Sequence, residues 1–127
     1  PNQWPTQGDI SSEFGWRRSP FGGRGSSFHE GIDIANNSGV MVVAAADGTV
    51  IFAGWKGAYG RMLEIDHGYG FKTIYGHNSA LLVKEGDKVK KGEEVARIGN
   101  TGRSTGPHLH FAVVKDGQPQ DPQIYLP

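Results

Sequence analysis

The most informative pattern of the chain is the run STGPHLHFAVV at residues 104–114. Two of the five histidines, His108 and His110, lie two positions apart at the start of a segment whose Phe and Val residues favour a β-strand. Side chains at i and i+2 of a strand point to the same face, so the two imidazoles would stand side by side, about 6.5 to 7 Å apart at the backbone. Both could then reach one site, or they could fill a sheet face and bond to backbone groups.

A second polar pattern, FHEGIDIA, lies upstream at residues 28–35. In a straight strand His29 and Asp33 would share a face but lie about 13 Å apart, too far for one metal ion. Gly31 lies between them and permits the turn or bulge that would bring the two side chains together. Alone, this pattern is best explained by an ordinary His–Asp hydrogen bond. Together with His108 and His110 it favours a metal site.

Composition limits the possible classes of protein. A chain of 127 residues is expected to form one domain, residues 1–127, with a core large enough to need no covalent staples. Thirteen basic and thirteen acidic side chains cancel, which argues against a non-specific nucleic-acid binder or a polybasic membrane-surface module. No cysteine is present, so a zinc site would have to use His, Asp or Glu. No apolar run approaches the ~18 residues of a membrane span, and no signal peptide opens the chain. An exported protein would therefore be represented by its mature part or an excised domain.

Short strands joined by tight turns are the expected architecture, since twenty glycines and seven prolines are spread along the sequence. Residues 40–46 read as a buried strand, and Asp47-Gly48 is expected to fold it back on residues 49–53 as a hairpin. Two more strands are expected at residues 62–66 and 71–75. The turn between them carries His67, which we interpret as a structural residue satisfied by nearby backbone groups.

Three further segments carry weaker signals. Residues 76–79 are expected to form a loop at a strand end, where His77 is either exposed or an acid–base histidine. Residues 16–27 are interpreted as a loop that carries several basic residues. It is either solvated or forms the rim of a binding groove. The charges of residues 84–99 are interpreted as a solvated edge that discourages sheet-to-sheet aggregation.

The whole set of motifs resembles one family: the zinc endopeptidases of the lysostaphin and LytM type, metallopeptidase family M23. Three segments match its motifs: HEGID at residues 29–33, YGHN at 75–78 and GRSTGPHLHF at 102–111. Residues 43–50 and 86–92 also resemble the hairpin and edge strands of the family. The resemblance covers about residues 10–122. It implies a mainly β fold, a twisted antiparallel sheet with a second small sheet and a groove above the zinc.

The resemblance also implies the chemistry of the site. His29, Asp33 and His110 match the positions that hold one zinc ion. Three protein ligands leave a position of a tetrahedral zinc open, as in catalytic sites, and the nucleophile would be a zinc-bound water. His77 and His108 match the acid–base histidines, one taking the proton of water and the other orienting it or stabilising the tetrahedral oxygen. The sequence does not divide these roles.

Tyr59 matches a groove tyrosine of the relatives. It either donates a hydrogen bond to the oxyanion or packs against neighbouring side chains.

The implied substrates are peptide cross-links or stem peptides of bacterial peptidoglycan, at glycine bridges or D-alanyl bonds, with a weak preference for the latter. An extracytoplasmic location follows from that substrate: the cell wall, the periplasm or the medium. Regulatory or wall-binding domains could accompany this one in a longer protein.

Two other functions compete with a hydrolase. The first is a catalytically silent relative of the same fold that binds the wall or regulates other wall proteins, although every matched ligand and both histidines are present here. The second is a biotinyl or lipoyl carrier, because residues 85–92 resemble their strand pattern. Carriers present a lysine at a hairpin tip, and the expected tip at Asp47-Gly48 has none.

Overall fold

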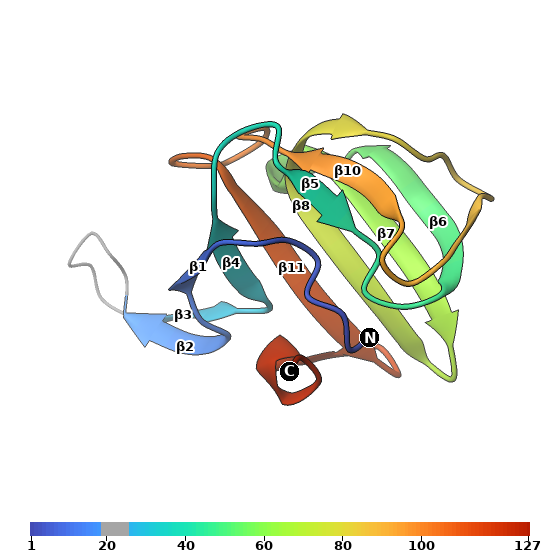
Figure 1. Cartoon of the computed structure of the whole chain (residues 1–127). Helices are drawn as coiled ribbons and strands as arrows, with labels where there is room; N and C mark the ends of the chain where they lie inside the picture. The colour runs from blue at the N-terminus through green and yellow to red at the C-terminus, as the bar shows by residue number, and fades with distance from the viewer. Residues whose placement is uncertain (19–25) are drawn as a thin grey trace.

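The computed structural model describes residues 1–18 and 26–127. Strands dominate this part of the chain, and they are joined by short turns and two 3₁₀ turns (Figure 1). In chain order the elements are β1 (Asp9–Ser12), β2 (Gly15–Arg18), β3 (Ser26–His29), β4 (Ile32–Ala35), β5 (Met41–Val43), β6 (Gly48–Trp55), η1 (Gly57–Tyr59), β7 (Arg61–Gly68), β8 (Phe71–Leu81), β9 (Lys88–Val89), β10 (Glu94–Ile98), β11 (His108–Lys115), β12 (Gln118–Gln120) and η2 (Pro122–Ile124).

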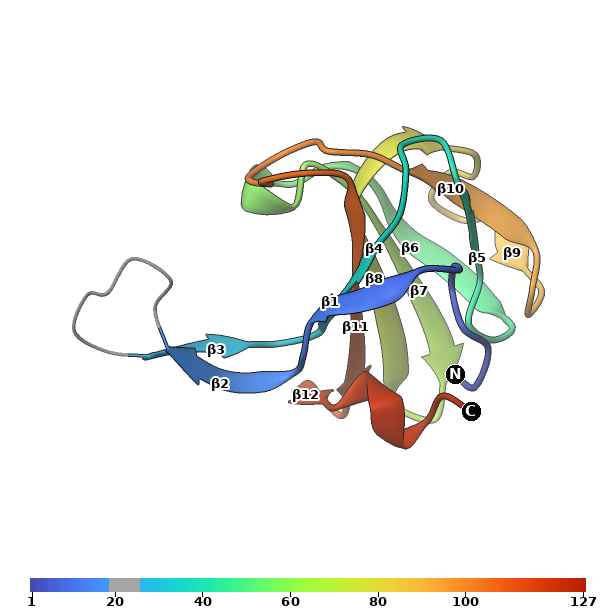
Figure 2. The ribbon, with the colours of Figure 1, turned by 60° about the vertical axis from the view of Figure 1, so that its left-hand side comes forward.

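The strands of the described residues form one large and one small sheet. The large sheet has ten strands, with β1-β4-β11-β8-β7-β6-β9 along its main path, and all its pairings are antiparallel. Strands β2 and β3 form the small sheet, which projects from the body of the domain (Figure 2). The prediction of a twisted, mainly antiparallel β fold with a second small sheet is confirmed.

The core lies on the inner face of the large sheet and follows the alternation expected of half-buried strands. In β4 and β11 the residues Ile32, Ile34, Leu109 and Val113 are buried, and Phe111 and Tyr75 are fully enclosed with ring centroids 5.4 Å apart. Tyr75 accepts a hydrogen bond from the amide of Ala45 and shares another with Thr73, so its buried hydroxyl is satisfied. These central strands therefore give β11 a rigid support.

The prediction of a hairpin around Asp47-Gly48 is wrong. Strand β5 pairs with β10, whereas β6 pairs with β7 and β9. The backbone of Ala44 bonds instead to Glu93 and Gly92, at 2.9 Å each, so the chain crosses from one part of the sheet to the other at this turn. A Gly at a turn marks a change of direction but does not choose which strands pair afterwards.

The structure also corrects the loop expected at residues 76–79. Strand β8 continues through them to Leu81, and a bulge opposite β7 interrupts its register between Tyr75 and Asn78. His77 has a φ of 66° within this bulge. Of the basic loop expected at residues 16–27, residues 16–18 and 26–27 belong to β2 and β3, and residues 19–25 lie outside the described residues.

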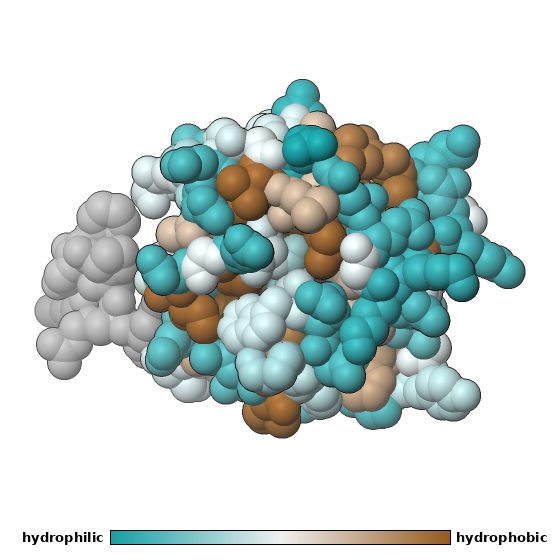
Figure 3. All heavy atoms as spheres, viewed as in Figure 1, coloured by the Kyte–Doolittle hydropathy of each residue, from teal (hydrophilic) through white to brown (hydrophobic). Residues whose placement is uncertain are grey.

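The outer surface is mostly hydrophilic in the view of Figure 3, with hydrophobic residues in small separate groups. The charged side chains expected at an edge, such as Lys84, Lys88 and Lys90, are exposed. Within the described residues, no helix is long and apolar enough to span a membrane.

Candidate metal centre and groove

Strand pairing places two of the predicted ligands opposite one another. His110 of β11 is paired with Asp33 of β4 on one side and with Gly76 of β8 on the other. Nδ1 of His110 lies 3.0 Å from Oδ1 of Asp33. Both residues point to the face away from the core, because their neighbours Leu109 and Ile34 take the buried face.

His29 joins this pair from the end of β3. Its Nε2 lies 3.3 Å from Oδ1 of Asp33 and 3.3 Å from Nδ1 of His110. Gly31 permits the approach by its lack of a side chain. A Cβ there would stand 2.3 Å from the carbonyl oxygen of Phe111 and 3.1 Å from the ring of His110. The predicted convergence of His29 and Asp33 is thus seen, with close backbone contact as the reason for the glycine.

The three converging atoms have the spacing of metal ligands. Donors 2.0 to 2.2 Å from a tetrahedral ion are about 3.3 to 3.6 Å from one another, and the observed triangle of 3.0, 3.3 and 3.3 Å is close to that geometry. His29, Asp33 and His110 therefore form a cluster that could hold one metal ion.

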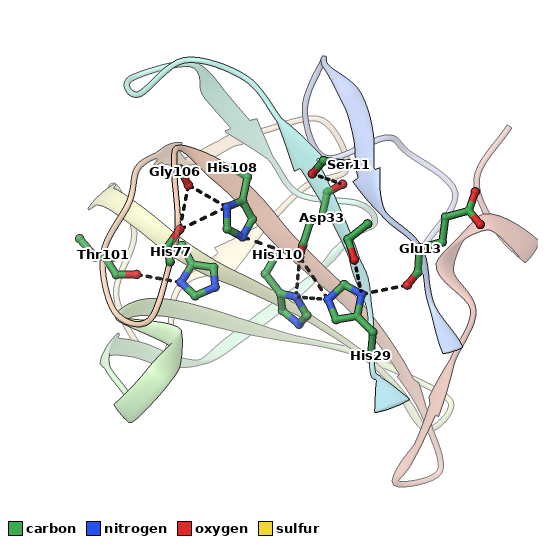
Figure 4. A network of polar contacts seen from close by, with 11 residues as sticks. Ser11, Glu13, His29, Asp33, His77, Thr101, Gly106, His108 and His110 are labelled. Carbon is green, nitrogen blue, oxygen red and sulfur yellow. Dashed lines mark hydrogen bonds and ion pairs between the residues drawn. The ribbon is translucent and has the colours of Figure 1, made fainter. Parts of the chain in front are cut away.

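Hydrogen bonds fix how three of the histidines face the groove. Nδ1 of His29 is 2.9 Å from the Glu13 carbonyl, Nδ1 of His77 is 2.7 Å from that of Thr101, and Nδ1 of His108 is 2.8 Å from that of Gly106 (Figure 4). A carbonyl only accepts, so each Nδ1 carries the proton and each neutral ring keeps its Nε2 lone pair. Nε2 of His29 therefore meets Asp33 and His110 as an electron-pair donor. A cation placed between Nε2 of His29, Nδ1 of His110 and Oδ1 of Asp33 can accept an electron pair from each of the three atoms. A single shared proton cannot.

Burial raises the pKa of the Asp33 carboxyl, but His110 and His29 outweigh it, through hydrogen bonds and positive charge when their facing nitrogens are protonated, and hold the pKa below its usual range. The carboxylate is therefore ionised at neutral pH. An ionised oxygen beside two imidazole nitrogens is a donor set that suits a divalent metal of the zinc type.

The two histidines expected to perform acid–base chemistry lie beside the cluster. The rings of His77 and His108 are 4.8 Å apart, and the His77 ring is 6.2 Å from that of His110. Nε2 of His108 approaches Oδ1 of Asp33 at 3.8 Å. Burial lowers the pKa of His77, opposed by its bond to the Thr101 carbonyl, so this ring is neutral at pH 7 and can accept a proton.

Tyr59 stands over the same groove at the end of η1. Its ring centroid is 5.6 Å from that of His110, and a Cβ at Gly76 would be 3.2 Å from the Tyr59 ring. Burial and the negative charges of Glu30 and Glu64 raise the pKa of the hydroxyl. Tyr59 therefore stays protonated and can donate a hydrogen bond at neutral pH.

The groove around the cluster gathers residues from distant parts of the sequence. Its lining comprises the six candidate site residues and the following neighbours: Ser11, Ser12, Phe28, Glu30, Ala58, Arg103, Ser104 and Thr105. The structure thus brings together His29, Asp33, Tyr59, His77, His108 and His110. His67 lies outside, bonded to the Asp47 carbonyl at 2.7 Å and to Thr73 at 2.7 Å, as expected of a structural residue.

Sequence reasoning missed the groups that orient the imidazoles. The backbone carbonyls of Glu13, Thr101 and Gly106 carry no side-chain signature, so no pattern of residue types could identify them. Ser104 is the exception, because its hydroxyl bonds to the Gly106 carbonyl at 2.8 Å and lies 3.3 Å from Nδ1 of His108. A hydroxyl residue four positions before a histidine of the H-x-H pair was a usable signal.

Three convergent ligands at the base of a β-sheet groove, flanked by two further histidines, are the arrangement of a metal-dependent hydrolase. Residues 27–122 match the sequence profile of peptidase family M23. The chain belongs to this family.

Known proteins with similar sequences and structures include enzymes and a regulator. The DD-carboxypeptidase/endopeptidase Mpg of Neisseria meningitidis serogroup B is 46% identical over 119 residues, which are 93% of this chain and 27% of that protein. The murein hydrolase activator NlpD of Escherichia coli is 38% identical over 127 residues, 98% of this chain and 31% of the activator. A zinc-containing peptidase from Vibrio cholerae superposes with a TM-score of 0.88 at 40% identity, covering 94% of this chain and 38% of the other. The chain thus spans less than two fifths of each.

Proposed function

We propose that this chain is a zinc-dependent endopeptidase domain that hydrolyses peptide bonds in bacterial peptidoglycan. The triangle of donor atoms from His29, Asp33 and His110, with sides of 3.0 to 3.3 Å, is the observation that carries the proposal. Zinc is the metal we assign, because two imidazole nitrogens and one carboxylate oxygen suit it. The similarity to the zinc-containing peptidase from Vibrio cholerae supports this assignment.

The residues around the triangle would divide the work of peptide hydrolysis. When bound, zinc supplies the Lewis acidity that activates water and polarises the scissile carbonyl. In their neutral forms His77 and His108 have a lone pair on Nε2, so either ring can take a proton from water and return it to the leaving amine. The protonated hydroxyl of Tyr59 can donate a hydrogen bond to the oxygen that becomes negative.

The substrate is inferred from the relatives. Mpg is named as a DD-carboxypeptidase and endopeptidase, which supports D-alanyl bonds of the stem peptides and cross-links rather than glycine bridges. Peptidoglycan lies outside the cytoplasm, so we place the chain in the cell wall, the periplasm or the medium. We take residues 10–122 as the domain core within residues 1–127. Since the relatives are longer, wall-binding or regulatory domains would accompany it in a longer protein.

Digestion of purified peptidoglycans with different cross-bridges tests the proposal. The zinc-loaded protein is compared with its His110→Ala variant, and released fragments are identified by mass spectrometry. We expect fragments from the D-alanyl cross-linked wall with the unaltered protein, and none with the variant. New termini at glycine bridges would change the assigned bond. No fragments from either folded protein would refute the hydrolase.

The second candidate is a catalytically silent domain that binds the wall or regulates other wall enzymes. It is favoured by one observation, the 38% identity to the activator NlpD. The presence of all three donor residues and of His77 and His108 favours the hydrolase. A zinc-loaded protein that releases no fragments, but increases the release by a separate wall hydrolase, would support the second function.

A further inference from the structure

The groove is lined by one permanently positive side chain that has no ion-pair partner among the described residues. Arg103 lines the groove and is exposed, and none of the described residues forms an ion pair or a side-chain hydrogen bond with its guanidinium. The cationic side chains elsewhere in the chain include engaged ones: Arg97 pairs with Glu94 at 2.7 Å, and Lys115 donates to the Tyr69 carbonyl at 2.9 Å.

The backbone that carries Arg103 is tightly held. Its amide donates to the Ala58 carbonyl at 2.8 Å, next to the 3₁₀ turn that carries Tyr59. Gly102 precedes it with a φ of 76°, and a Cβ there would stand 2.4 Å from both the Ala58 carbonyl and the Gly60 amide. These contacts between two loops hold the backbone of Arg103 in place, so less conformational entropy is lost when its side chain binds a partner.

The position of Arg103 also defines which side of the groove it serves. The same loop supplies the carbonyls of Thr101 and Gly106, which orient His77 and His108. Arg103 therefore lies on the side of these two histidines, whereas Glu30, the exposed acidic residue of the lining, follows His29. A bound peptide would meet positive charge on one side of the metal cluster and negative charge on the other.

We propose that Arg103 is the carboxylate-binding residue of this groove and selects peptides that carry a free carboxylate on the side of His77 and His108. A guanidinium presents a planar fork of donors that matches a carboxylate with two parallel hydrogen bonds. The inference rests on the proposed function, and it specifies a property of the substrate: an acidic peptide group next to the scissile bond. A terminal D-alanyl carboxylate or the side-chain carboxylate of a stem peptide would meet that requirement.

The test uses soluble cross-linked peptidoglycan fragments in two forms, native and with their carboxyl groups converted to amides. We compare the unaltered chain with Arg103→Gln and Arg103→Lys, and use Arg61→Gln as the matched control. Arg61 is exposed on β7 and is not among the lining residues. Steady-state kinetics of the zinc-loaded proteins give kcat and KM, and calorimetry of the metal-free proteins gives dissociation constants without turnover.

We expect Arg103→Gln to raise KM and the dissociation constant for native fragments about two- to fivefold, as for an exposed ion pair. The amidated fragments should bind the variant and the unaltered chain equally, kcat should stay unchanged, and Arg103→Lys should recover part of the loss. Equal losses on both fragment types, or no loss on the native one, would overturn the inference. Binding that depends on Arg103 without any cleavage would refute the hydrolase and leave the carboxylate site standing.

Discussion

His110 of β11 and Asp33 of β4 are direct partners across an antiparallel strand pair, and their side chains meet at 3.0 Å. His108, two residues before His110, is paired with Ala35 and reaches Asp33 only at 3.8 Å. Both histidines face the same groove, but the register gives them unequal distances to the carboxylate. That inequality supports the proposed division of roles, in which His110 binds the metal and His108 acts beside it.

Replacing these two histidines by alanine should have different effects. His110→Ala removes a donor of the triangle, so we expect loss of both zinc and hydrolysis. His108→Ala leaves the triangle intact, so it should retain one zinc per chain and lose about 10² to 10⁴ in rate, as for an acid–base group. Metal analysis of the purified variants and their rates on peptidoglycan fragments would measure this. Equal loss of zinc in both would contradict the division of roles.

Gly31→Ala should loosen the site without replacing a ligand. The new Cβ would collide with the Phe111 backbone, so β4 must move away from β11 or the turn must distort. We expect a free energy of unfolding lower by about 1 to 3 kcal/mol and weaker zinc binding. Chemical denaturation and zinc titration measure the two effects. Gly54→Ala is the control, because its Cβ would meet nothing nearer than Phe52 at 3.7 Å, and it should change neither quantity.

Zinc should stabilise the folded chain. An ion that binds the native state alone adds about 2.7 kcal/mol at a hundredfold excess over its Kd, which for a domain of this size raises Tm by roughly 10 °C. Calorimetric scans with and without zinc would record the shift. His110→Ala should scan identically in both conditions, and a shift of similar size in that variant would mean that zinc binds elsewhere.

Acid should release the metal and stop hydrolysis. Ligand histidines must be neutral to bind zinc, and protons compete near their usual pKa of ~6.5. We expect both the rate and the zinc content to fall below about pH 6. His77 should not be the first group to fail, because burial lowers its pKa and keeps it neutral at lower pH. A rate that stays flat from pH 5 to 8 would argue against a histidine-dependent site.

His67 should make folding stability depend on pH independently of the site. Burial lowers its pKa in the folded chain, against its bond to the Asp47 carbonyl and the negative charges of Asp66 and Asp47. The unfolded chain then binds a proton at higher pH than the folded chain does, so the free energy of unfolding falls as the pH drops below about 6.5. Urea titrations of the unaltered chain and His67→Gln should show a smaller decline in the variant. Parallel declines would exclude His67 as a source.

Side-chain patterns predicted that His29, Asp33, His108 and His110 belong to one site, because alternation in a strand decides which residues share a face. That is why His108 and His110, spaced by two, could be assigned to one site from the sequence, and why His29 and Asp33 needed a break at Gly31. The choice of His29, Asp33 and His110 as the metal ligands came from the family resemblance. The three backbone carbonyls that orient the imidazoles could not be predicted in this way, because every residue has a carbonyl.

Pairing and register were harder to predict than the strands themselves. The bulge that gives His77 its φ of 66° depends on how β8 aligns with β7, which the sequence of β8 alone does not specify. The partner of β5 likewise depends on residues 94–98, far along the chain. Local propensity sets where strands form, and tertiary packing chooses their neighbours.

The donor triangle joins parts of the chain that are far apart in sequence. His29 and His110 are separated by 81 residues, and Asp33 and His110 by 77. This chain has no cysteine, and an ion bound there would cross-link β4 and β11. Secreted proteins often use a disulfide for that purpose. Loss of the ion would then end catalysis in the groove and remove this cross-link at the same time. The lifetime of the folded chain, and not just its rate of catalysis, would follow the metal supply of its surroundings.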